Sequence, residues 1–114
     1  MVFIDAYTKW VEAFAIGDLS SWTVLGVFVS EIVARYGTPA VVRSDRGTEF
    51  EGVFAEYLRE KGIYHAVIST AHPRANGLVE RYNGIIIDGF RRFTTMMPEG
   101  YWWEFLPDVL AGLR

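Results

Sequence analysis

Two short stretches near the start of the chain, Val2–Asp5 and Trp10–Ile16, are rich in β-branched and aromatic residues. Such residues favour extended backbone, and the Ala6–Lys9 segment between them can form a turn. The pattern therefore predicts a β-hairpin at the beginning of the chain.

Apolar residues then recur at helical spacing between a break at Gly17–Ser21 and Gly37. The Asp and Ser residues of the break suit a helix N-terminus, and glycine suits a helix C-terminus. We predict a helix over Ser21–Tyr36. Its apolar residues are Leu25, Phe28, Val29, Ile32, Val33 and Tyr36.

The middle of the chain predicts a strand, a helix and another strand. Ala40–Val42 is a short apolar run, and polarity returns at Arg43, so Asp45 is expected at the C-terminal end of a buried strand. Ile63–Ile68 is predicted to be the second strand. The helix between them stops at Gly62 and is indicated by Val53, Phe54, Tyr57 and Leu58.

A polar loop at Ser69–Gly77 precedes a further helix, which begins near Leu78. Helical spacing places Glu80, Asn83 and Ile87 on a different face from the apolar side chains of this helix. The apolar stripe consists of Leu78, Tyr82, Ile85, Ile86 and Phe93.

A break at Pro98–Gly100 separates that helix from a final one, which is expected to bend at Pro107. The elements follow the order β-β-α-β-α-β-α-α, which predicts a mixed β-sheet flanked by helices in one α/β domain over residues 1–114. The final helix is indicated by Trp102, Trp103, Phe105, Leu106, Val109, Leu110 and Leu113.

Composition supports a soluble domain and narrows its chemistry. Four Trp, six Tyr and eight Phe give this 114-residue chain material for a core. With no cysteine and two histidines, a structural zinc site would lack two of its usual four ligands. No apolar run reaches membrane-spanning length and no signal peptide is recognisable, so we expect an intracellular protein that does not bind membranes. The net charge of −3 argues against a large basic face for nucleic acid.

Asp45 and Glu80 are the strongest candidates for chemistry. Cleaving or joining phosphodiesters requires an activated nucleophile and a stabilised leaving oxygen, and two Mg²⁺ ions can provide both. Magnesium binds hard oxygen ligands, so carboxylates on a strand end and a helix suit it. Nucleic acid would then be bound through metal and a few local cations.

Simpler interpretations of the same residues stay open. Asp45 lies in Ser-Asp-Arg-Gly, which is also good turn chemistry, and Glu80 can interact with a helix dipole from the first turn. His72 with Pro73 suits a loop as well as a ligand. Arginines 81, 91 and 92 can contact phosphates or solvate a helix face, and tryptophans 102 and 103 suit a core or an interface.

Several motifs that follow one another in order resemble those of one known family. Together they are similar to the catalytic core of retroviral-type integrases, particularly those of gypsy-class LTR retrotransposons. The motifs are Gly37-x-Pro39, Ser44-Asp-Arg-Gly-Thr-Glu-Phe50, Gly62-Ile63, Ser69-Thr70, His72-Pro73, Asn76-Gly77 and Glu80-Arg-x-Asn83.

The resemblance implies an RNase H-like fold and a nucleotidyl transferase that uses a D,D,E triad with Mg²⁺ or Mn²⁺ to process DNA ends and join them to target DNA. Asp45 matches the second acid and Glu80 the third, although one residue fewer separates them than is usual in the family. By the same resemblance, Asn83 and the loop containing His72 and Asn76 lie beside DNA. Arg81 is a further candidate phosphate contact, and a homo-oligomer acting in the nucleus is expected.

The first acid of the triad is not accounted for. Asp5 lies in Asp5-Ala-Tyr-Thr-Lys-Trp10, which resembles the family's second strand, whereas the first catalytic aspartate belongs to the strand before it. We therefore expect this chain to be a truncated or eroded copy without the first acid, in which two strands lack their usual neighbour. A rival hypothesis makes Asp5 a substitute acid.

Three functional hypotheses follow from these residues. The first is an integrase-type polynucleotidyl transferase core with Asp45 and Glu80 as metal ligands. The second is a non-catalytic remnant of an integrase that binds nucleic acid or another protein. The third is an unrelated α/β domain whose acids serve only turns and helix ends.

Overall fold

The computed structural model describes residues 1–68, 77–94, 104 and 106–113. Contacts divide the chain into two compact units, one formed by Met1–Ala15 with Gly77–Arg114 and the other by Ile16–Asn76. We call these the first and second unit. None of the helices in the described part of the chain is both long enough and apolar enough to cross a membrane.

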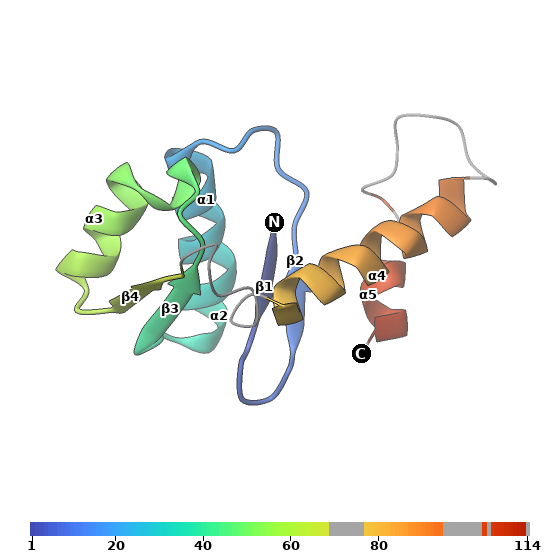
Figure 1. Ribbon diagram of the computed structural model, residues 1–114, viewed down its shortest axis with the longest axis horizontal. Helices are drawn as coiled ribbons and strands as arrows, with labels where there is room; N and C mark the ends of the chain where they lie inside the picture. The colour runs from blue at the N-terminus through green and yellow to red at the C-terminus, as the bar shows by residue number, and fades with distance from the viewer. Residues whose placement is uncertain (69–76, 95–103, 105, 114) are drawn as a thin grey trace. The chain divides into compact units, whose positions relative to one another are not determined.

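The first unit consists of a β-hairpin and two helices. Strands β1 (Val2–Ile4) and β2 (Val11–Ala13) pair antiparallel, with Val2 opposite Ala13, which confirms the predicted hairpin. Helix α4 (Gly77–Thr94) contacts β1, and α5 (Leu106–Leu113) contacts both β2 and α4. Figure 1 shows α5 beside the longer α4.

The core of this unit joins one side of the hairpin to the helices. Val11 and Ala13 are two residues apart and therefore face the same side of β2. The core residues of α5 are three and four positions apart and therefore share one face of that helix. Each of these side chains is at most 8% exposed. The cluster consists of Val11, Ala13, Ile86, Leu106, Val109 and Leu110, with Val2 and Ile4 packed against it.

The face of α4 that packs inward is narrower than the sequence predicts. Ile86 is 6% exposed, whereas Ile85 is 39% and Ile87 is 51% exposed. Successive helical residues are about 100° apart, so only one of three neighbouring isoleucines can point directly into the core. Ile87 was predicted to lie outside the apolar stripe, and its exposure confirms that prediction. Ile85 was predicted to lie within the stripe, and that prediction is wrong.

Pro107 does not bend a helix. Helix α5 begins at Leu106, so Pro107 lies in its first turn. At that position the missing backbone N–H costs nothing, because the first amides of a helix have no partner within it. The prediction of a bend at Pro107 is therefore wrong, and the proline instead favours the start of the helix.

The second unit contains the predicted helix, whose central part is π-helical rather than α-helical. Its three parts are α1 (Ser21–Val27), the π-helical turn η1 (Phe28–Val33) and α2 (Ala34–Tyr36), so the expected span is confirmed. Within η1 the amide of Ala34 donates to the carbonyl of Val29, five residues back. The Ser30 hydroxyl donates to the Gly26 carbonyl at 2.8 Å, a contact that competes with regular helical bonding.

A parallel strand pair follows. Strands β3 (Val41–Ser44) and β4 (Tyr64–Val67) pair in register, with Val41 opposite Tyr64. The predicted strand Ala40–Val42 ended too early, because backbone bonds rather than side-chain polarity set its length: the Ile68 amide still donates to the Ser44 carbonyl at 2.8 Å. The described strands thus form two two-stranded sheets, one antiparallel and one parallel, with helices beside both.

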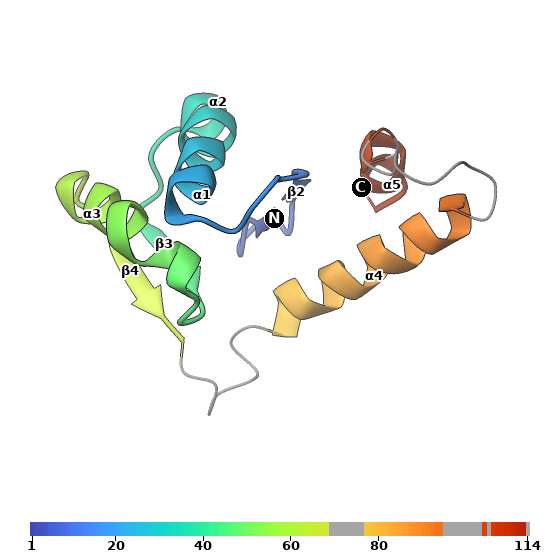
Figure 2. The same ribbon diagram turned by 90° about the horizontal axis from the view of Figure 1, so that it is seen from above.

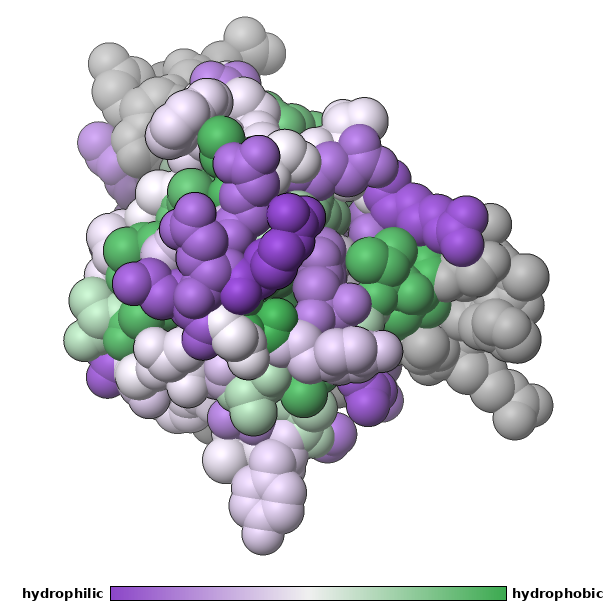
Figure 3. Space-filling view, turned by 90° about the vertical axis from the view of Figure 1, so that its left-hand side faces the viewer, coloured by the Kyte–Doolittle hydropathy of each residue, from purple (hydrophilic) through white to green (hydrophobic). Residues whose placement is uncertain are grey.

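Between β3 and β4 lie the 3₁₀ turn η2 (Thr48–Phe50) and helix α3 (Gly52–Glu60). The chain leaves α3 through Gly62, whose φ of +71° suits glycine, and the predicted stop is confirmed. Helix α3 packs against α1 and β4 (Figure 2). The face that carries α3 is rich in hydrophilic side chains (Figure 3).

Aromatic side chains fill the core of the second unit. The rings of Phe28 and Phe54 meet edge to face with centroids 5.4 Å apart, and each of these residues is at most 2% exposed. Ser21 adds a polar link, since its hydroxyl donates to the Glu51 carbonyl and accepts the Phe54 amide at 3.0 Å. A side chain from α1 thereby serves as the missing N-cap of α3. The buried apolar residues are Val24, Phe28, Phe54, Leu58 and Ile63.

Two glycines of α4 offer a direct test of the first unit. A Cβ atom on Gly84 would meet nothing within 4 Å, whereas one on Gly89 would lie 2.8 Å from Cγ1 of Val109. Gly84→Ala should raise the free energy of unfolding by about 1 kcal/mol through helix propensity. Gly89→Ala should lower it by about 1 kcal/mol, because overpacking outweighs the same gain.

Urea unfolding of the two variants measures this difference. They are matched controls for each other, since both replace glycine by alanine within one helix. Equal stabilisation by the two substitutions would contradict the close approach of α4 and α5 at Gly89.

Candidate active site

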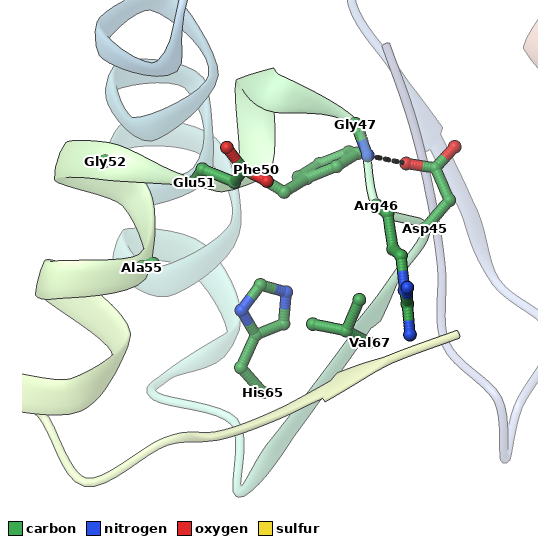
Figure 4. Close-up of a pocket in the computed structure, with 9 residues that line it drawn as sticks. All are labelled: Asp45, Arg46, Gly47, Phe50, Glu51, Gly52, Ala55, His65 and Val67. Carbon is green, nitrogen blue, oxygen red and sulfur yellow. Dashed lines mark hydrogen bonds between the residues drawn. The ribbon is translucent and has the colours of Figure 1, made fainter. Parts of the chain in front are cut away.

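Asp45 directly follows β3, as the sequence predicts, and is exposed at the carboxyl end of the parallel strand pair. Its Oδ1 accepts the Gly47 amide at 2.7 Å, which the dashed line in Figure 4 marks. This bond is the one expected of a turn-forming aspartate. Within the described residues the second carboxylate oxygen has no hydrogen bond, so it is open to a ligand.

Gly47 allows a second carboxylate to lie close to this loop. A Cβ atom on Gly47 would be 2.5 Å from Oε2 of Glu49, so a larger residue at this position would require the Glu49 carboxylate to move. No separate role was predicted for Glu49 from the sequence. Its position makes the end of β3 locally acidic, with Arg46 as a neighbouring cation.

A hollow of about 330 Å³ opens beside this loop. Apolar side chains and His65 form its floor, and Asp45 and Glu51 bring carboxylates to its rim (Figure 4). It is therefore a mixed surface rather than a purely acidic pocket. Its lining residues are Asp45, Arg46, Gly47, Phe50, Glu51, Gly52, Ala55, His65 and Val67.

Ser44 and His65 are the residues of this region that sequence reasoning missed. Ser44 is 5% exposed, and its Oγ lies 2.6 Å from Nε2 of His65. The His65 ring packs edge to face against Phe54 with centroids 6.0 Å apart. Burial lowers the pKa of His65. The sequence contains one signal that could have identified His65. Side chains two residues apart in a strand point to the same face, so the spacing of Ile63, His65 and Val67 places the histidine on the face toward α3.

Glu80 lies in the first turn of α4 and is exposed, which agrees with the expected free face. It belongs to the first unit and Asp45 to the second, and each carboxylate is described within its own unit. The described residues contain no group of three His, Cys, Asp or Glu side chains close enough to hold a metal ion. The pairing of Asp45 with Glu80 stays a prediction.

The other predicted site residues fall into two groups. Arg81 and Asn83 are exposed on α4, as a DNA contact requires. His72 and Asn76 lie outside the described residues. Their roles in DNA binding all stay predictions.

Asp5, the possible substitute acid, closes the hairpin turn. Its Oδ1 accepts the amides of Tyr7 at 2.8 Å and Thr8 at 3.2 Å. This carboxylate therefore has a structural use in the turn between β1 and β2. Its use as a substitute acid stays a prediction.

Comparisons with known proteins agree on one family. Residues 1–73 match the family model described as "Integrase core domain". The Gag-Pol polyprotein of walleye dermal sarcoma virus is 30% identical over 115 residues, which cover all of this chain but 7% of the polyprotein. The chain thus spans a small part of that relative.

Solved structures show the same fold. The HTLV-2 integrase catalytic core domain in complex with magnesium, in its trimeric form, has a TM-score of 0.78 and 23% identity, covering 98% of this chain and 70% of that one. The simian T-cell lymphotropic virus intasome in complex with PP2A regulatory subunit B56 gamma has a TM-score of 0.83 and 23% identity, covering 96% and 39%. The expected RNase H-like fold is confirmed.

The lowered pKa of His65 predicts a pH dependence of stability. The unfolded chain keeps the ordinary histidine pKa of about 6.5, so it takes up a proton more readily than the folded chain. His65 should therefore reduce stability as the pH falls below about 6.5 and have a constant effect above it. Replacing it by glutamine, which does not titrate, should make the fall in stability shallower.

Unfolding free energies of the original chain and His65→Gln at about pH 7.5 and about pH 5.5 measure this effect. His72 is present in both proteins, so the difference between their pH slopes isolates His65. Identical slopes would show that burial does not disfavour the charged ring.

Proposed function

The chain belongs to the integrase core domain family, and on that premise we propose that it is a polynucleotidyl transferase core that joins element DNA ends to target DNA with a divalent cation. The observation that carries the proposal is the position of Asp45. This residue lies within the matched residues 1–73, at the end of β3, with one carboxylate oxygen fixed by Gly47 and the other open. Because the relatives reported are viral, the gypsy class stays a prediction.

The donor atoms of this region fit Mg²⁺ or Mn²⁺ better than softer metals. The chain has no cysteine, and the open oxygen of Asp45 is a hard ligand. Glu80 would supply a second carboxylate from α4. The related HTLV-2 core was solved in complex with magnesium, which supports the same choice of ion for this chain.

A divalent cation bound there would activate the attacking oxygen and neutralise charge on the leaving oxygen. The chain's own contribution is to hold its carboxylates in place. Asp45 is fixed at the end of a hydrogen-bonded strand, and Glu80 is carried by an 18-residue helix. Such rigid supports keep ligand geometry constant during the reaction.

DNA would bind along α4, where Arg81 and Asn83 are exposed. Arg81 can contact a phosphate and Asn83 can donate to phosphate or base, with His72 and Asn76 completing the contacts. We also propose that the protein acts as a homo-oligomer in the nucleus. The trimeric and dimeric forms of the HTLV-2 core support the oligomer.

Mn²⁺ should stabilise the chain through both proposed ligands. At about one hundred times its Kd, the ion should add about 2.7 kcal/mol of stability and raise the Tm. Asp45→Asn and Glu80→Gln should each abolish that rise, because each removes a charged oxygen ligand. Thermal unfolding with and without Mn²⁺ measures the effect.

Glu56→Gln is the matched control for this titration. Glu56 is an exposed acid of α3 outside the proposed site, so its variant should keep the full rise in Tm. A rise that persists in Asp45→Asn and Glu80→Gln would refute the assigned ligands. No rise in the original chain would refute the metal site itself.

Arg81 should contribute one phosphate contact. Arg81→Ala should weaken binding to duplexes of any sequence and reduce the slope of log K against log salt by about 1. Fluorescence anisotropy over a series of KCl concentrations measures that slope. Arg59→Ala on α3 replaces another exposed arginine and should leave the slope unchanged.

The two titrations also separate the rival functions. DNA binding through Arg81 without Mn²⁺ binding would favour the non-catalytic remnant over the transferase. Binding of neither ligand would contradict the transferase and a remnant that binds nucleic acid, and would leave only a remnant that binds another protein.

A further inference from the structure

The side chain of Ser44 connects the two parallel strands at the point where the chain turns into the Asp45 loop. Ser44 is the last residue of β3, and its ladder partner in β4 is Val67. Its hydroxyl reaches diagonally to Nε2 of His65, 2.6 Å away, and also lies 3.0 Å from the Asp45 carbonyl oxygen. Ser44 is 5% exposed, so water does not replace these partners.

The number of available protons fixes the direction of both bonds. A serine hydroxyl has one hydrogen to donate, and a carbonyl oxygen can only accept. Ser44 therefore donates to the Asp45 carbonyl, and its oxygen accepts a hydrogen from His65. Both contacts are satisfied together only when Nε2 of His65 carries the proton. The direction of donation runs from His65 through Ser44 to Asp45.

Asp45 is consequently held at two places. Its carbonyl accepts from Ser44, and Oδ1 of its carboxylate accepts from the Gly47 amide at 2.7 Å. The first bond restrains the peptide that follows Asp45, and the second restrains the side chain against that same loop. Together the two hydrogen bonds fix the direction in which the other carboxylate oxygen points.

We propose that His65 is a positioning residue for Asp45: through Ser44 it fixes the loop that presents the Asp45 carboxylate to a divalent cation. The proposal deepens the proposed function and rests on it for the identity of the ligand. The chain of bonds itself stands on the geometry of Ser44. A residue that orients a metal ligand in this way commonly changes metal affinity by about 10- to 100-fold when it is replaced.

His65 also packs against Phe54, so its hydrogen bond must be separated from its packing. His65→Phe keeps an aromatic ring and removes the donor. His65→Gln loses the ring but keeps an N–H at about the position of Nε2. If His65 acts through the packing of its ring, His65→Phe should preserve the conformation of the Asp45 loop. If it acts through its hydrogen bond to Ser44, His65→Gln should preserve that conformation. Tyr64→Phe, at an exposed neighbour on β4, is the matched control.

The first experiment uses no metal. In the original chain, ¹⁵N NMR should show His65 as the Nε2–H tautomer at neutral pH, and the opposite tautomer would overturn the proposal. The exchange of the Gly47 amide with water should become about tenfold faster in His65→Phe and in Ser44→Ala, because the loop opens more often. His65→Gln and Tyr64→Phe should keep the original rate. Unchanged exchange in folded His65→Phe would overturn the proposal.

The second experiment adds Mn²⁺ and follows paramagnetic broadening of the Gly47 signal. His65→Phe should weaken the apparent affinity about tenfold, and His65→Gln should restore it. Full affinity in His65→Phe would overturn the proposal. If the original chain itself shows no broadening, the proposed metal site fails, while the exchange rates and the tautomer still decide whether His65 positions Asp45.

Discussion

One buried hydroxyl determines how the second unit presents Asp45. Ser44 has a single hydrogen, and its partners on either side are a ring from the neighbouring strand and the carbonyl that begins the loop. An unsatisfied polar group in so buried a place would cost about 1–3 kcal/mol, so both bonds are needed together. The direction of the loop and the open carboxylate oxygen both depend on this residue.

Local patterns predicted the elements well because their causes are local. The hairpin, the long helix ending at Gly37 and the helix stopping before Gly62 all follow from spacing and from residues that begin or end helices. The end of β3 was placed two residues too early, since the ladder bonds that extend it to Ser44 come from β4. Polarity along one strand carries no information about a partner strand.

The candidate site was predicted in part for the same reason. Asp45 could be placed at a strand end, because the change in polarity after Val42 is visible in the sequence. The link between Ser44 and His65 could not be predicted. The two are separated by 20 intervening residues along the chain, and the parallel register of β3 and β4 brings them together. Ile85 shows a similar limit: three consecutive isoleucines contain no periodicity that tells which one packs inward.

The contact between Gly89 and Val109 also constrains how this sequence can change over time. Any side chain at residue 89 meets a buried methyl group of the neighbouring helix. A larger residue would be accepted there at lower cost after Val109 had become smaller, although either change alone would be disfavoured. The two positions are therefore expected to be epistatic, so that the order of mutations, and not only their identity, decides which descendants of this chain still fold.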